Sequence, residues 1–224
     1  MSSETKVFER ENKLPVEEGL ARGTLFVVSS PSGGGKGTLI QRVLETGLNL
    51  SYSVSYTTRA PRSGEMEGRE YFFVTREKFE AMIAAGAFLE WAHVHSKLYG
   101  TSSQQVQCEV ASGRDIILEV DVQGAASVRE LMTDSVSIFI LPPSLEILRQ
   151  RLITRGTDSP PELELRLRNA PEEMKHYKAF DYVIINDEVE RAAGQLASII
   201  DAERARRPRQ EPHVKRIVES VSLG

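Results

Sequence analysis

The chain has 224 residues, of which 40% are hydrophobic and 27% charged, a composition typical of a globular protein with a sizeable core. Its net charge of −4 argues against a general nucleic-acid-binding protein, which would be strongly basic. The single cysteine, Cys108, excludes an internal disulfide and a cysteine-clustered zinc site, and favours a reducing cytosol. No apolar run approaches the ~20 residues of a membrane span, and the polar N-terminus is unlike a signal peptide. We therefore expect a soluble cytoplasmic protein that binds neither nucleic acid nor a membrane.

The N-terminal part of the chain divides at Gly23. Residues 1–22 are charged and interrupted by Pro15, which predicts a poorly ordered arm with room for a short helix at 16–21. Residues 24–28 form a short apolar run, typical of a buried parallel strand. A small-residue loop follows, and then apolar spacing that predicts a helix over 38–44, ended by Gly47.

The pattern of a buried strand returns three more times, at 116–120, 136–141 and 182–185. Helical patterns separate these runs, at about 123–131, 144–154, 162–178 and 188–204. Strands that alternate with helices in this way predict a three-layer α/β fold with a mostly parallel sheet.

Two other regions have a different character. Within residues 53–113, weak alternation at 54–57 and 70–74 predicts antiparallel strands, and a helix is expected over 76–85. We interpret this block as an insertion that carries specificity. Residues 203–216 hold six basic residues, two acids and two prolines, which predicts a solvated, partly frayed tail, with contact to nucleic acid as the alternative.

A glycine-rich loop links the first predicted strand to the first helix. It runs through Ser30, Pro31, Ser32, Gly33, Gly34, Gly35, Lys36, Gly37 and Thr38. Glycines let backbone N–H groups converge on phosphate oxygens, the helix N-terminus adds positive potential, and Lys36 supplies a charge for the β- and γ-phosphates. Ser30 replaces the usual first glycine and Gly37 the usual hydroxyl residue, although Thr38 follows directly. The sequence therefore predicts a phosphate loop for a nucleoside triphosphate.

Several further motifs follow the phosphate loop in a fixed order. Residues 53–65 supply two arginines three apart around a proline, and residues 68–73, 86–92 and 99–101 add glycine, aromatic and acidic positions. Together with the phosphate loop, they resemble guanylate kinase, a P-loop nucleoside monophosphate kinase, from about Gly23 to residue 200. The resemblance implies phosphoryl transfer from ATP to GMP, and to dGMP, giving ADP and GDP by direct in-line attack with Mg²⁺.

The resemblance also implies a division of the chain. A guanylate kinase domain would cover 23–204, between the arm at 1–22 and a basic tail at 205–224. Its core would comprise 23–52, 114–143 and 173–204, with a GMP-binding insertion at 53–113 and a small helical lid at 144–172. The sequence does not fix the oligomeric state, and a homo-oligomer stays open.

Two groups of residues match family positions that bind GMP. The phosphate would be held by Arg59, Arg62, Tyr71 and Tyr99, whose guanidinium and phenol groups are suitable donors for a dianion. Guanine would be read by Ser55, Glu90 and Thr101. A carboxylate at Glu90 can accept from both N1–H and the 2-amino group of guanine, a pair of donors that adenine lacks.

The remaining candidates belong to the nucleotide and metal sites. Alternation along a strand places Glu119 and Asp121 on one side, at the carboxyl end that borders the ligand crevice. Glu119, where the family usually has aspartate, and Thr38 are candidates for magnesium, and Asp121 for GMP. The resemblance further implies lid arginines that reach the ATP phosphates, at Arg151, Arg155 and Arg166, and a residue near adenine, Asn186.

Two other functions agree with part of the sequence. Guanylate-kinase-like domains of scaffold proteins keep the fold and bind phosphopeptides, but they have lost the nucleotide loop that this chain keeps. A related phosphokinase could act on a ribose bisphosphate instead. Ser55, Glu90 and Thr101 together favour guanine.

Overall fold

The computed structural model describes residues 21–62, 64–94, 96–156 and 159–222. The arm and short helix predicted for the N-terminus lie almost wholly outside these residues. Within them, no helix is long and apolar enough to cross a membrane.

The centre of the molecule is a five-stranded parallel sheet, sheet A, with the strand order β2-β7-β1-β8-β9. Its strands are β1 (Leu25–Ser29), β2 (Leu50–Tyr52), β7 (Asp115–Glu119), β8 (Val136–Leu141) and β9 (Tyr182–Ile185). Four of them confirm the predicted apolar runs, and β2 was missed because three half-buried residues give no apolar signal. The central strands are buried on both faces, as expected of a parallel sheet covered by helices.

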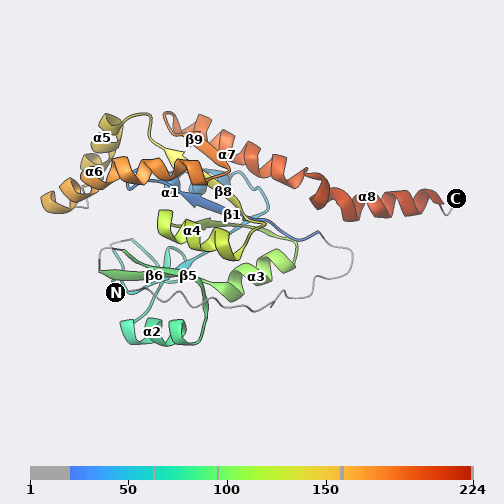
Figure 1. Cartoon of the computed structure of the whole chain (residues 1–224), viewed down its shortest axis with the longest axis horizontal. Coiled ribbons are helices and arrows are strands. Elements are labelled where there is room, and N and C mark those ends of the chain that lie inside the picture. The colour runs from blue at the N-terminus through green and yellow to red at the C-terminus, as the bar shows by residue number, and fades with distance from the viewer. Residues whose placement is uncertain (1–20, 63, 95, 157–158, 223–224) are drawn as a thin grey trace.

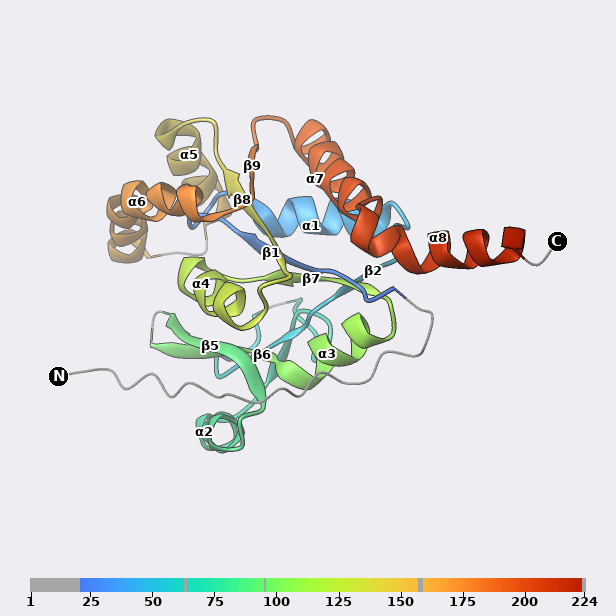
Figure 2. The ribbon, with the colours of Figure 1, turned by 45° about the vertical axis from the view of Figure 1, so that its right-hand side comes forward.

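Helices cover both faces of sheet A, which confirms the predicted three-layer fold (Figure 2). On one face lie α1 (Lys36–Glu45) and α7 (Val189–Arg204), with Val43 and Leu196 in the core. On the other lie α3 (Ser103–Ala111) and α4 (Val122–Leu131), with Val106 and Val128 in a second core. This arrangement leaves the carboxyl ends of the strands as the edge at which loops can build a site.

The inserted block forms a second sheet, sheet B, with the order β4-β3-β6-β5. Its elements are β3 (Ser55–Thr57), β4 (Tyr71–Phe73), α2 (Arg76–Ala84), β5 (Phe88–Val94) and β6 (Lys97–Ser102). The predicted antiparallel pairing of the first two strands is wrong, because β3 and β4 run parallel. The long loop over residues 58–70 carries the chain back to the same end of the sheet, so alternation alone could not reveal the direction.

The segment predicted to be a lid folds as two helices, α5 (Leu145–Arg155) and α6 (Pro160–Lys175), followed by the short helix η1 (His176–Ala179). Leu148 and Leu152 of α5 pack against Ala170 of α6 in a small core of their own. Proline is tolerated at the first position of α6, because a backbone N–H at that position has no hydrogen-bond partner within a helix.

The C-terminal region corrects the predicted frayed tail. Residues Arg207–Ser222 form a helix, α8, which extends from the body of the molecule beyond α7 (Figures 1 and 2). Most of its side chains are exposed, as expected of a solvated segment. Its Arg209, however, donates to the buried Asp115 at 2.6 Å, and this anchor was not visible in the composition of the tail.

Candidate functional site

The phosphate loop lies between the buried strand β1 and the N-terminus of α1, as predicted. Gly33 and Gly35 have φ of +86° and +89°, a left-handed conformation that favours glycine. A Cβ atom at Gly35 would lie 2.4 Å from Nδ2 of Asn186, so a side chain at Gly35 would also collide with this residue, which directly follows β9. The loop therefore keeps its backbone N–H groups close to the helix N-terminus, where anions bind.

Glu119 lies beside this loop, at the carboxyl end of β7. Its carboxylate is 3.6 Å from Nζ of Lys36 and accepts a hydrogen bond from the Tyr52 hydroxyl at 3.3 Å. Burial, and then the charge of Glu119, raise the pKa of Tyr52, which keeps that hydroxyl protonated as a donor. Sequence reasoning missed Tyr52 because β2 itself was missed.

The two expected metal-binding residues are Glu119 and Thr38. A Cβ atom at Gly37 would be 3.5 Å from Oε2 of Glu119, so the carboxylate faces the position where related loops carry a hydroxyl. Thr38 is exposed, one residue further along the first turn of α1. A carboxylate and a nearby hydroxyl are the oxygen ligands that Mg²⁺ uses together with water and substrate phosphates, so these residues fit such an ion.

Helix α6 contacts the phosphate loop through Ser32. Arg166 donates from NH1 to the Ser32 hydroxyl at 2.6 Å, and the backbone N–H of Ser32 donates to Glu173 at 3.0 Å. Arg166 and Glu173 are seven residues apart, two helical turns, and therefore lie on one face of α6. The structure thus brings the predicted Arg166 to the loop, together with Glu173, whose distance from the loop in sequence concealed it.

Asn186 and Arg151 meet on another side of the loop. Asn186 is buried and donates from Nδ2 to the Gly34 carbonyl at 3.0 Å, while its backbone carbonyl accepts from NH2 of Arg151 at 2.8 Å. Within the described residues, the buried atoms Oδ1 of Asn186 and NH1 of Arg151 have no hydrogen-bond partner. Buried polar atoms of this kind call for an explanation, and a bound ligand supplies one. Arg155 ends α5, and its side chain lies outside the described residues.

Sheet B has two chemically different faces. On one face Phe79 of α2 stacks on Phe88 with ring centroids 4.5 Å apart, and Tyr56 stacks on Phe72 at 4.8 Å. Gly100 lies under these rings, since a Cβ atom there would be 2.9 Å from Phe88. Strand register places most of the predicted GMP-binding residues on the other face: Ser55 pairs with Tyr71, Thr57 with Tyr99, and Glu90 with Thr101.

Glu90 is the most perturbed carboxyl group of this polar face. The side chain is buried and accepts a hydrogen bond from the Thr101 hydroxyl at 2.6 Å. Burial raises the pKa of Glu90 to about 7; hydrogen bonds from Thr101 oppose the shift and the charge of Asp121 adds to it. A register shift in the pairing between Phe88 and Glu90 sets the direction of this side chain.

The first turn of α4 closes over Glu90. A Cβ atom at Gly124 would lie 2.9 Å from Oε2 of Glu90, so glycine permits the close approach. The predicted strand alternation of Glu119 with Asp121 is wrong, because β7 ends at Glu119 and Asp121 is the N-cap of α4. Asp121 accepts from the Gly124 N–H at 2.8 Å, and its Oδ1 lies 3.3 Å from the same Cβ position at Gly124, which places it next to the predicted guanine site.

The predicted phosphate-binding residues of GMP gather around Arg59. Its guanidinium lies 5.2 Å from the centroid of the Tyr71 ring, which in turn lies 5.8 Å from the ring of Tyr99. Burial, and then the charge of Glu119, raise the pKa of Tyr71 to about 12. The charge of Glu119 thus acts both on Lys36 of the phosphate loop and on Tyr71 of sheet B. Arg62 is exposed at the rim.

A phosphate loop after the first strand of a parallel sheet, facing a second small sheet with its own arginines, defines the class of P-loop kinases. The sequence profile of the guanylate kinase family matches residues 22–203. The guanylate kinase of Polaromonas sp. is 50% identical over 182 residues, 81% of this chain and 88% of that relative. The guanylate kinase of Dechloromonas aromatica is 51% identical over 180 residues, 80% of this chain and 89% of that relative.

A solved structure agrees with these sequences. The crystal structure of guanylate kinase from Anaplasma phagocytophilum has a TM-score of 0.72 and 38% identity, and the match covers 84% of this chain and 90% of that one. The chain belongs to the guanylate kinase family, the nucleoside monophosphate kinases that phosphorylate GMP with ATP. The resemblance noted in the sequence is confirmed.

Proposed function

We propose that this chain transfers the γ-phosphoryl group of ATP to GMP and dGMP, with the roles of individual residues as follows. The observation that carries the proposal is the buried Glu90, which faces the ligand side of sheet B with hydrogen-bonding capacity to spare. The N1–H and 2-amino donors of guanine would complete its hydrogen bonds, while Thr101 holds the carboxylate in place. Ser55, on the same face, lies in register to contact the base.

The acceptor phosphate lies between Arg59, Arg62, Tyr71 and Tyr99. Their donors neutralise its charge, which reduces the repulsion between two polyanions as they approach. Asp121 contributes from the start of α4, next to Glu90.

ATP occupies the phosphate loop. Backbone N–H groups of the phosphate loop and of the first turn of α1 hold its phosphates, except that Pro31 has none and those of Ser32 and Gly34 already donate to Glu173 and to the Pro31 carbonyl. Lys36 contacts the β- and γ-phosphates, and Asn186 lies on the adenine side. The lid supplies Arg151, Arg155 and Arg166. An oxygen of the GMP phosphate attacks the γ-phosphorus in line, so no covalent enzyme intermediate is required, and catalysis comes from positioning and charge neutralisation.

Glu119 and Thr38 would hold Mg²⁺, in part through water. When bound, the ion neutralises charge that develops on the β- and γ-phosphate oxygens. Closure of the lid over the site excludes water and so limits hydrolysis of ATP. The single cysteine supports the cytoplasm as the place of this reaction.

A coupled assay with ATP and alternative acceptors tests the proposal. GMP and dGMP should be phosphorylated, and AMP and a ribose bisphosphate should not. Turnover of the ribose bisphosphate alone would assign the chain to the related phosphokinases, and no turnover with any acceptor would favour a phosphopeptide-binding role.

A further inference from the structure

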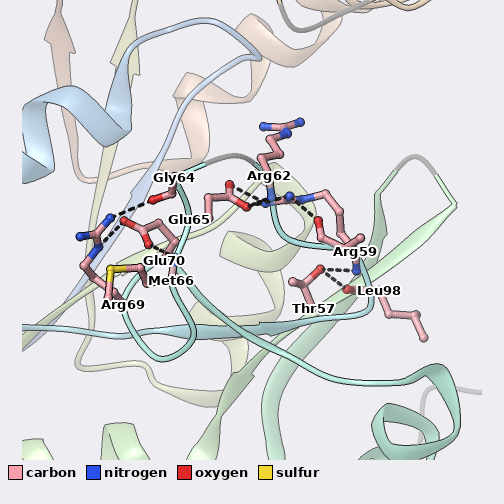
Figure 3. A network of polar contacts seen from close by, with 10 residues as sticks. Thr57, Arg59, Arg62, Gly64, Glu65, Met66, Arg69, Glu70 and Leu98 are labelled. Carbon is pink, nitrogen blue, oxygen red and sulfur yellow. Dashed lines mark hydrogen bonds and ion pairs between the residues drawn. The ribbon is translucent and has the colours of Figure 1, made fainter.

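Glu65, which is not among the predicted site residues, binds Arg59, the arginine at the centre of the predicted GMP-phosphate site. In the loop between β3 and β4, Glu65 accepts from NH2 and NH1 of Arg59 at 2.8 and 2.9 Å, a parallel two-bond pair (Figure 3). The side chains are 14% and 17% exposed, so the pair is shielded from solvent on most sides. Such a pair is much more rigid than an ion pair on the open surface.

The carboxylate of Glu65 also binds the backbone of Arg62, the second arginine of the loop. The N–H of Arg62 donates to Oε2 of Glu65 at 2.7 Å. In Figure 3 the guanidinium of Arg62 points away from Glu65, so its charged group stays available while its backbone is fixed. One side chain thus sets the position of both arginines.

The guanidinium of Arg59 is not used up by these contacts. Glu65 and the Ala60 carbonyl, at 2.8 Å, engage three of its five N–H donors. The hydrogen bond to Glu65 is the largest influence raising the pKa of Arg59; burial opposes it, and a hydrogen bond with Tyr99 adds to it. Arg59 therefore lies between Glu65 and Tyr99, and at least one of its donors stays available for an anion.

We infer that Glu65 is a positioning residue for the acceptor phosphate, an inference that rests on the proposed role of Arg59. By fixing the fork of Arg59 and the backbone of Arg62 before GMP arrives, Glu65 removes the ordering cost that these residues would otherwise meet on binding. A carboxylate that merely competed with phosphate for Arg59 would have the opposite effect, and it would not need the N–H of Arg62. Removing Glu65 should raise KM for GMP if Glu65 positions the arginines and lower it if Glu65 competes with the phosphate, so the change in KM separates the two roles.

The test compares Glu65→Gln with Glu70→Gln in the full-length protein. Glu70 is a matched control because it lies in the same loop, accepts from the Met66 N–H at 2.7 Å and pairs with Arg69 at 2.6 Å. Both variants remove one negative charge. Glu65→Gln should raise KM for GMP roughly 10- to 100-fold, the equivalent of one hydrogen bond between charged groups, with KM for ATP unchanged. Glu70→Gln should leave both within about twofold.

Guanosine, which lacks the phosphate, separates positioning from loss of structure. Its inhibition constant against GMP should be unchanged in Glu65→Gln if only the hold on the phosphate is lost. An equal weakening of guanosine and GMP would overturn the inference, because the loop would then have lost its fold. A lower or unchanged KM for GMP would also overturn it. Should Glu65→Gln not fold, Glu65→Asp replaces it, since its shorter side chain cannot span both partners and should also raise KM.

Arg59→Gln distinguishes failure of this inference from failure of the proposed function. If Arg59→Gln raises KM for GMP and Glu65→Gln does not, Glu65 has no positioning role. If neither variant changes KM, the phosphate site proposed around Arg59 is itself wrong.

Discussion

Two buried carboxylates, Glu90 and Asp115, show how differently the two ends of this molecule are built. Asp115, 3% exposed, begins β7 and accepts from the Thr24 N–H at 2.8 Å, from Arg204 at 2.7 Å and from Arg209 at 2.6 Å. Burial would raise the pKa of Asp115, but these hydrogen bonds outweigh it, and the pKa lies below its ordinary value. Glu90, 8% exposed, has donors from Thr101 within the described residues, and burial raises its pKa to about 7.

The difference follows from what each carboxylate is for. Asp115 joins the start of β7 to the end of α7 and the first turn of α8, and its hydrogen bonds are complete in the folded chain. A buried charge without enough donors is costly, so Glu90 lowers stability where Asp115 raises it. Such a group is expected where a ligand completes the hydrogen bonds. We therefore expect changes on the nucleotide side to affect activity, and changes at Asp115 to affect stability.

The largest effect is expected for Lys36→Ala. If Lys36 contacts the transferring phosphoryl group as proposed, removing its charge should lower kcat by at least about 100-fold, while GMP binding is largely spared. The ion pair of Lys36 with Glu119 spans 3.6 Å between partly exposed groups, so its loss should change the melting temperature little. Steady-state kinetics and thermal melting measure both quantities, with the exposed Lys78→Ala as the control. Near-normal kcat would contradict the assignment of the phosphate loop.

Glu90→Gln should lower kcat/KM for GMP by roughly 10- to 200-fold, because the amide presents an NH₂ group to the donors of guanine and leaves at least one polar group unpaired. KM for ATP should not change, since the phosphate loop lies on other elements. Discrimination against AMP should weaken, mainly through the loss on GMP. Measured kcat/KM values for GMP and AMP decide the matter, and an unchanged GMP value would remove Glu90 from the guanine site.

The same variant should not destabilise the protein. A carboxyl group whose folded pKa is raised binds its proton more tightly when folded, so it lowers stability as pH rises from its ordinary pKa through about 7. The cost at pH 8 is about 3 kcal/mol at most. Glu90→Gln should therefore melt at the same temperature as the parent protein or higher at that pH.

Asp115→Asn should have the reverse profile, with kinetic constants unchanged and the free energy of unfolding lowered by about 1.5–3 kcal/mol, because the partly exposed Arg204 and Arg209 lose one charged acceptor. Urea denaturation measures the loss. The control is Asp201→Asn, because Asp201 also pairs with Arg204 but is itself exposed. Since the folded pKa of Asp115 is lowered, its contribution is complete at neutral pH and disappears as the pH falls through that pKa. Loss of activity without loss of stability would reverse the comparison.

Sequence patterns predicted the parts of this structure that local chemistry determines. Four strands of sheet A have continuous apolar runs, and the phosphate loop combines glycine, lysine and its place before a helix. The prediction that Glu90 and Thr101 read guanine comes from the family resemblance. The structure adds that they are cross-strand partners, which no spacing along the chain reveals.

The features that were missed depend on partners far away in the sequence. The helix α8 is anchored by Asp115, which precedes Arg209 by 94 residues, so the composition of the tail alone predicted a frayed segment. Glu173 reaches Ser32 across 141 residues, and Tyr52 depends on a three-residue strand. Glu65 was overlooked for another reason: a carboxylate near arginines in a polar loop has the same sequence pattern whether it faces solvent or orients a guanidinium.

The smallest effect, on guanosine binding as a function of pH, tests the feature that separates Glu90 from Asp115. With a pKa of about 7, Glu90 is mostly ionised at pH 8 and mostly protonated at pH 6, and only the ionised form accepts from both donors of guanine. Guanosine affinity should therefore fall about 10-fold from pH 8 to pH 6, with a proton released on binding at the lower pH. Guanosine is used because the phosphate of GMP titrates near pH 6.

Glu90→Gln should abolish the pH dependence of guanosine affinity. Asp121→Asn should move it to lower pH, because the charge of Asp121 helps to raise the pKa of Glu90. Calorimetric titration measures affinity and proton release together. A pH dependence that persists in Glu90→Gln would show that another group titrates, and Glu90 would then be ionised and as fully satisfied as Asp115.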